Sequence, residues 1–155
     1  METQVLLVVR GGLRRGAEAF ELTRAVNAGT GFACTVHANS AKEALEALVN
    51  AALMAGENVS ERVVRKVFGS AIDLVVHLDR DGVRDGDRQL RRKVVEVLAV
   101  VPSLHEDFTT EPIFIRDDLD SSLRWTGARP PAALTKSIES SFGKGALARV
   151  FGDGQ

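Results

Sequence analysis

Only one cysteine occurs among the 155 residues, and this scarcity limits the kinds of site that the chain can build. A single thiol, Cys34, cannot form an intramolecular disulfide. Cys34 and His37 have the Cys-x-x-His spacing of half a zinc site, but the sequence offers no second pair of ligands. His77 and His105 stand alone. We therefore predict no metal site.

The chain also lacks an excess of charge of either sign. Its 20 Lys and Arg residues nearly balance its 21 Asp and Glu residues, so nothing in the overall charge favours a nucleic acid as partner. The longest apolar run, Val94 to Val101, contains Glu96 and is too short to span a bilayer. The first residues do not follow the pattern of a signal peptide. We therefore expect a cytoplasmic protein.

A phosphate-binding loop is the third absence. Such a loop has the pattern Gly-x-x-x-x-Gly-Lys-Ser/Thr between a strand and a helix, because its backbone N–H groups and lysine contact the phosphates while its hydroxyl holds Mg²⁺. The nearest approach is Gly143-Lys144-Gly145, which lacks the hydroxyl residue and has no strand before it. The sequence alone therefore predicts no complete nucleotide site.

Apolar periodicity divides the first half of the chain into strands and helices. We predict a buried strand over 4–9, a helix over 17–27, and an interior strand over 32–36 that ends at His37. The next helix begins at Ser40, which has capping-box spacing with Glu43. This helix carries a wide apolar stripe at helical spacing, formed by Ala41, Ala44, Leu45, Leu48, Val49, Ala52 and Leu53.

The second half begins with another helix, for which Ser60 is the expected N-cap. Its inward-facing residues are expected to be Val63, Val64, Val67 and Phe68. Alternating residues then predict a β-hairpin with a long polar tip, followed by an exposed loop, two short strands and two short helices. The expected ranges are strands over 72–78 and 93–101, a loop over 103–111, strands over 112–116 and 123–125, and helices from Ala132 onward.

The most informative motifs lie between Arg15 and Ser40. They are Arg15-Gly16-Ala17-Glu18-Ala19, then Arg24-Ala25-Val26-Asn27 with Gly29, and then Thr35-Val36-His37-Ala38-Asn39-Ser40. In this order and spacing they resemble the type II/type IV secretion ATPase family, and more closely its Flp (tight-adherence) pilus branch. In that family an Arg-Gly segment follows the Walker B strand, and a "His box" ends the next strand. The resemblance continues through the strand at 72–76 and less sharply to about Trp125.

The resemblance implies an α/β fold. Residues 15–101 would form the C-terminal half of a RecA-like P-loop NTPase sheet, followed by the β-hairpin. Residues 1–14 do not match the family, and residues 102–155 would form a small mixed extension. The catalytic glutamate of the family falls on Leu13 or on Val8, depending on the alignment. A truncated gene, an upstream frameshift or a naturally short protein would each explain this difference.

The resemblance also implies a set of functional residues and partners. His37 would be the catalytic contact to a γ-phosphate, and Arg15, Arg24 and Asn39 would bind the nucleotide or a neighbouring subunit. From the residues alone, Asn39 is equally a turn residue before the helix cap. ATP and Mg²⁺ are implied by the family only. The implied partners are full-length ATPase subunits, which form hexamers, and an inner-membrane platform protein that would bring the chain to the membrane.

Three functions remain open at this point. The chain is the C-terminal fragment of a motor that is not catalytic alone, a non-catalytic docking or regulatory module, or a degenerate remnant. A hydrolase triad of Ser40, His37 and Asp73 is disfavoured because no nucleophile elbow surrounds Ser40.

Overall fold

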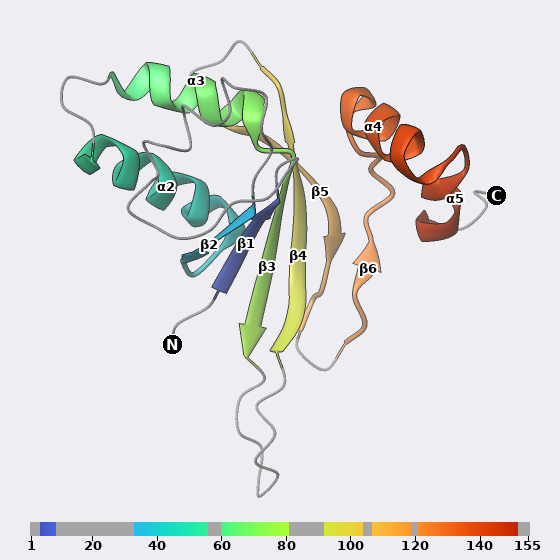
Figure 1. Cartoon of the computed structure of the whole chain (residues 1–155). Helices are drawn as coiled ribbons and strands as arrows, with labels where there is room; N and C mark the ends of the chain where they lie inside the picture. The colour runs from blue at the N-terminus through green and yellow to red at the C-terminus, as the bar shows by residue number, and fades with distance from the viewer. Residues whose placement is uncertain are drawn as a thin grey trace, which may run out of the picture.

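The computed structural model describes residues 4–8, 33–55, 60–80, 92–103, 107–118 and 121–151. The predicted helix over 17–27 lies outside these residues, and so do Arg15, Arg24 and His105. Within the described ranges the chain forms six strands and four helices, shown in Figure 1. In chain order these are β1 (Gln4–Val8), β2 (Ala33–His37), α2 (Ala41–Ala55), α3 (Glu61–Ala71), β3 (Leu74–Arg80), β4 (Arg92–Val101), β5 (Thr109–Ile115), β6 (Arg124–Trp125), α4 (Ala132–Phe142) and α5 (Ala146–Phe151).

All six strands belong to one sheet with the order β2-β1-β3-β4-β5-β6. Every neighbouring pair is antiparallel. The predicted α/β class is therefore confirmed, and so is the antiparallel pairing of β3 with β4. The described strands do not show the parallel RecA-like sheet that the family resemblance implies.

Strands two places apart in this antiparallel sheet run in the same direction, and β2 and β3 are such a pair. β1 lies between β2 and β3 and is antiparallel to both, so β2 and β3 run in the same direction. Helices α2 and α3 connect these two strands along the chain. Parallel strands need such a crossover, because a tight turn cannot return the chain to its starting edge. β2-α2-α3-β3 is therefore a crossover unit with β1 inserted between its strands.

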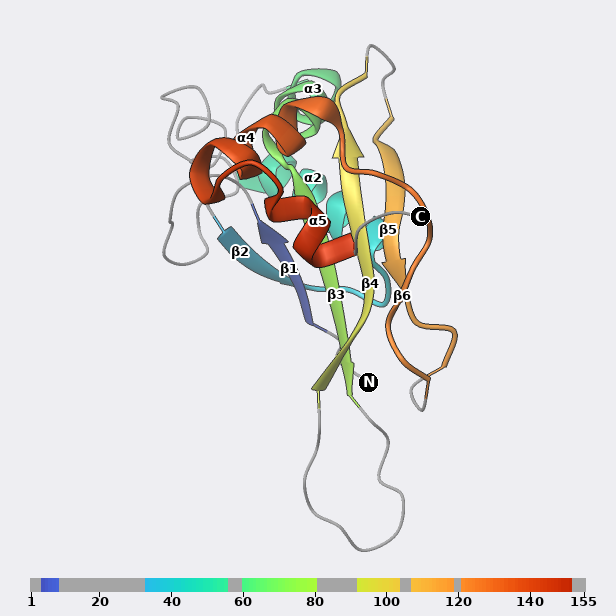
Figure 2. The same ribbon diagram turned by 90° about the vertical axis from the view of Figure 1, so that its right-hand side faces the viewer.

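The helices form a layer on each side of the sheet. Figure 1 shows α2 and α3 on one side, with α4 and α5 on the other. Figure 2 gives the same arrangement after a quarter turn, with α4 and α5 in front of the strands and α2 and α3 behind them. The chain thus builds three layers, in which the sheet separates two helical pairs.

The main core lies between the sheet and the pair α2–α3. The predicted apolar stripe of α2 is confirmed. Leu53 packs against the six buried residues of the stripe, which are Ala41, Ala44, Leu45, Leu48, Val49 and Ala52. Val64 and Phe68 of α3 are 0% exposed in the same cluster, which also contains Val75 and Leu98 of the sheet. The burial of a continuous apolar stripe holds each helix against the strands.

The second face of the sheet is contacted by an aromatic cluster. The Phe151 ring of α5 stacks on Phe114 of β5, with centroids 5.6 Å apart, and lies 5.1 Å from the Trp125 ring of β6. The Trp125 indole Nε1–H donates to the Ala128 carbonyl at 2.6 Å. These contacts connect the last helix of the chain to the outer strands.

Two expectations about the second half of the chain need correction. Val63 was expected to face inward, but it is 54% exposed. Residues 103–111 were expected to form an exposed loop, but β5 already begins at Thr109. Ser60 is the N-cap residue of α3, as expected, although its hydroxyl makes no capping hydrogen bond.

Pro112 explains why the start of β5 was missed. Proline has no backbone N–H to donate to a neighbouring strand. It is therefore tolerated in a strand where one side is unpaired. β5 pairs with β6 only at Phe114 and Ile115, so Pro112 pairs with β4 alone.

No helix among the described residues is both long enough and apolar enough to cross a membrane.

Candidate functional site

His37 is the last residue of β2, and its side chain is exposed. The position at the carboxyl end of a strand is as expected, but the strand was expected to be interior and β2 lies at the edge of the described sheet. Its setting differs from that of a parallel sheet, because the cross-strand neighbour of His37 is Gln4 at the beginning of β1. In open parallel sheets the carboxyl ends of neighbouring strands meet and form a ligand crevice. The described antiparallel strands do not bring a second carboxyl end directly beside His37.

The chain turns from β2 into α2 through a hydrogen-bonded cap. The Glu43 backbone N–H donates to Ser40 Oγ at 3.1 Å, as the capping-box spacing predicts. The return bonds to the Glu43 carboxylate come from Asn39, whose backbone N and side-chain Nδ2 lie 3.3 Å and 3.0 Å from Oε2. In a standard capping box the N-cap residue makes this return bond, so the cap here extends by one residue toward His37.

The cap gives Asn39 a definite structural contact. Its side-chain amide donates to Glu43, and no hydrogen bond joins Asn39 to His37 within the described residues. The connection keeps His37 and Asn39 close together at the start of α2, while Arg15 and Arg24 lie outside the described ranges. Of the four residues implied by the resemblance, the structure therefore places His37 and Asn39 in one exposed turn.

Sequence reasoning missed an ion-pair network between α2 and α3. The Arg65 guanidinium donates from Nη1 and Nη2 to the two Glu46 carboxylate oxygens, at 2.8 Å and 2.6 Å. Its Nε donates to Glu61 Oε1 at 2.8 Å. The pair of Glu61 and Arg65 could have been predicted, because residues four apart are neighbours on a helix. The contact with Glu46 could not, because Glu46 lies 19 residues from Arg65 in the sequence.

This network shifts the pKa values of its members. The hydrogen bonds from Arg65 hold the pKa of Glu46 below its ordinary value, since they favour the charged carboxylate. The hydrogen bonds to Glu46 and Glu61 likewise raise the pKa of Arg65. The Arg65 side chain is 15% exposed, whereas those of Glu46 and Glu61 are 49% and 58% exposed. The arrangement is a bidentate clamp between two helices, which leaves the guanidinium committed to carboxylates.

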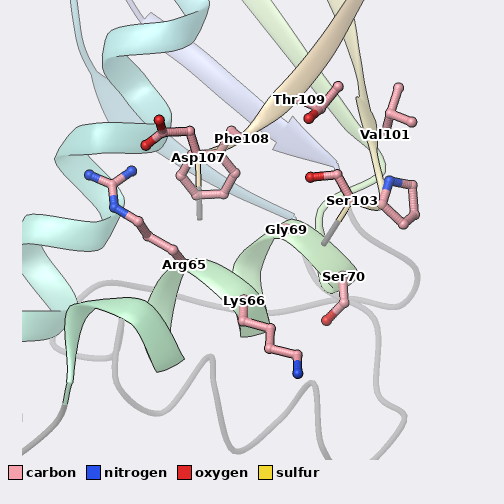
Figure 3. Close-up of a pocket in the computed structure, with 10 residues that line it drawn as sticks. Arg65, Lys66, Gly69, Ser70, Val101, Ser103, Asp107, Phe108 and Thr109 are labelled. Carbon is pink, nitrogen blue, oxygen red and sulfur yellow. The ribbon is translucent and has the colours of Figure 1, made fainter. Parts of the chain in front are cut away.

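A small cavity lies where α3 meets the connection between β4 and β5. Figure 3 shows the Phe108 ring near Arg65, whose guanidinium carbon is 5.8 Å from the ring centroid. The cavity has a volume of about 90 Å³. Pockets for cofactors and drug-sized ligands are several times larger, at roughly 300–1,000 Å³. The cavity is therefore too small to enclose a nucleotide.

Two further side chains of the strands, His77 and Cys34, are buried or partly buried. Only 8% of His77 is exposed, and its Nε2 has no hydrogen-bond partner among the described residues. Its neighbours across the sheet are Val5 and Glu96. Burial also raises the pKa of the Cys34 thiol to about 11. The thiol is therefore protonated at neutral pH and is a poor nucleophile.

No group of three or more His, Cys, Asp or Glu side chains in the described ranges is arranged to hold a metal ion. Comparison of the chain with protein-family models and with curated proteins found no match.

Proposed function

We propose that this chain is a C-terminal part of a secretion or pilus-assembly ATPase, and that it supplies His37 to a nucleotide site completed by a second subunit. The observation that carries the proposal is the exposed His37 at the end of β2, followed directly by the capped start of α2. This geometry suits the Thr35-to-Ser40 motif, whose order with Arg15 and Arg24 resembles that family.

The crossover unit supports the same proposal. β2 and β3 run in the same direction and are connected by α2 and α3, which cover one face of the sheet. We infer that this unit corresponds to the later strands of a RecA-like sheet. The antiparallel insertion of β1 is the main departure, and it falls in residues 1–14, where the sequence also departs from the family.

The two subunits would contribute different groups to the proposed site. Phosphoryl transfer is driven mainly by positioning and by charge stabilisation around the γ-phosphate. ATP and Mg²⁺ would be held by a phosphate-binding loop of the second subunit, since this sequence has no such loop. The His37 imidazole would approach from the subunit boundary and donate a hydrogen bond to a phosphate oxygen. The cap formed by Ser40, Asn39 and Glu43 would fix the turn that presents it.

The test is ATP turnover by the purified chain, alone and mixed with a relative that carries the phosphate-binding loop. We expect no turnover by the chain alone and a changed rate in the mixture. His37→Ala should abolish that change. Thr35→Ala is the matched control, because Thr35 is exposed two residues earlier on the same strand. Equal effects of the wild type and the His37 variant would contradict a role for the imidazole.

A docking or regulatory module is the second candidate. It is supported by the packed core that α2 and α3 form against the sheet, and by the cap at the start of α2. In this case the chain would bind a full-length ATPase subunit or an inner-membrane platform protein. Binding to either partner that is unaffected by His37→Ala, with no change in ATP turnover, would favour docking over completion of an active site.

A further inference from the structure

The C-terminal helices carry two exposed large apolar residues that are not part of the aromatic cluster. Phe142, the last residue of α4, is 72% exposed, and Val150 of α5 is 61% exposed. The Arg149 guanidinium Nη2 donates to the Phe142 carbonyl at 3.3 Å, so the end of α4 and the middle of α5 lie together. An exposed phenylalanine is costly in water, and large exposed apolar groups mark contact surfaces.

The turn between α4 and α5 depends on two glycines. Gly143 and Gly145 have φ values of +91° and +82°, which side chains rarely tolerate. A Cβ atom at either position would meet nothing within 4 Å, so conformation and not space requires glycine there. The two glycines reverse the chain sharply and leave Phe142 and Lys144 exposed at the tip.

The charge around this tip differs from that of the rest of the chain. Residues 129–151 contain four basic residues against one acidic residue, a net charge of +3, whereas the whole chain has a net charge of −1. The remaining residues therefore carry −4. All four cations are exposed, and the acidic residue is partly buried. The cations are Arg129, Lys136, Lys144 and Arg149.

We propose that the α4–α5 hairpin, through Phe142, Val150 and its exposed cations, rests on an anionic lipid surface. Apolar side chains at a tip enter the headgroup region, and Lys and Arg beside them are attracted to anionic lipids. The two contributions add, because the strength of such binding scales with the buried apolar area plus the electrostatic attraction to anionic lipids. A protein partner would explain the apolar residues, but the concentration of positive charge on this hairpin favours a negatively charged surface. This inference does not depend on the proposed ATPase relationship.

Co-sedimentation of the full chain with lipid vesicles tests the proposal. Vesicles of phosphatidylcholine with roughly a third phosphatidylglycerol should bind the chain, and pure phosphatidylcholine vesicles should not. Phe142→Ala should weaken binding roughly tenfold through lost apolar burial. Lys144→Gln should weaken it about fivefold, and added salt should weaken it further.

Met54→Ala is the matched control, since Met54 is 90% exposed but belongs to α2 on the opposite side of the sheet. It should bind vesicles like the wild type. Fluorescence of Trp125, the only tryptophan, verifies that each variant is folded. Absence of binding to anionic vesicles overturns the proposal, and so does equal binding of the Phe142 and Met54 variants. A Phe142-dependent dimer that does not bind vesicles overturns it in favour of self-association.

Discussion

The packing of α3 makes a strong prediction about Phe68. This ring is 0% exposed and belongs to the cluster between α2, α3 and the sheet. Truncating a buried phenylalanine to alanine removes its transfer free energy and leaves a cavity, at a cost of about 3–5 kcal/mol. Domains of this kind have about 5–15 kcal/mol of stability in total. Phe68→Ala should therefore remove a large part of the free energy of unfolding and lower the Tm by roughly 6–20 °C.

Urea denaturation, followed by Trp125 fluorescence and circular dichroism, measures this loss. The matched control is Val63→Ala on the same helix, since Val63 is 54% exposed. The control should change the free energy of unfolding by no more than about 0.5 kcal/mol. The two variants thus compare a buried and an exposed position of one helix. A cost below about 1 kcal/mol for Phe68→Ala, or equal costs for both variants, would show that α3 is packed differently.

Other contacts give three further predictions. Because Arg65 lowers the pKa of Glu46, the stability that this carboxylate contributes is present above its unfolded-state pKa and is lost as the pH falls through the lower folded-state value. Glu46→Gln should therefore lower the free energy of unfolding by about 0.2–1 kcal/mol at pH 7. The variant should also lose less stability than the wild type at acidic pH, and urea denaturation at neutral and at acidic pH measures both effects. With a pKa of about 11, Cys34 should react with iodoacetamide at pH 8 roughly tenfold more slowly in the native chain than in urea, and equal rates would contradict its burial. Phe151→Ala should release α5 from β5 and β6, so that Trp125 emission shifts and limited proteolysis cuts first within the C-terminal helices.

Local patterns in the sequence were sufficient to predict the helices of the main core. The stripe of α2 and the cap at Ser40 follow from spacing within a single helix, and both are present. The position of Val63 was harder to predict, because Val63–Val67 and Val64–Phe68 are both pairs at helical spacing. The sheet selects the line from Val64 to Phe68 and leaves Val63 at the flank. Periodicity finds the apolar side of a helix, but packing decides where its edge lies.

Contacts between distant segments could not be predicted in the same way. The clamp between Arg65 and Glu46 joins two helices whose relative position is set by the sheet. The burial of His77 depends on its place in the middle of a six-stranded sheet, with β1 on one side and β4 on the other. The relative direction of paired strands could not be predicted either, because a short apolar segment fits a parallel or an antiparallel partner.

The antiparallel insertion of β1 limits what His37 can do with the described residues of its own chain. In a parallel sheet, the loops that follow neighbouring strands would converge beside it and offer phosphate-binding groups. Here its neighbour is Gln4 at the beginning of β1, and the next strand presents Leu78 in the same row. Asn39 is bonded to Glu43, and Arg65 is bonded to two carboxylates on the helical layer. Of these described residues, only His37 is therefore left to contact a γ-phosphate. Under the proposed function a second subunit would supply the phosphate-binding loop, so the mixture is a more informative sample than the isolated chain.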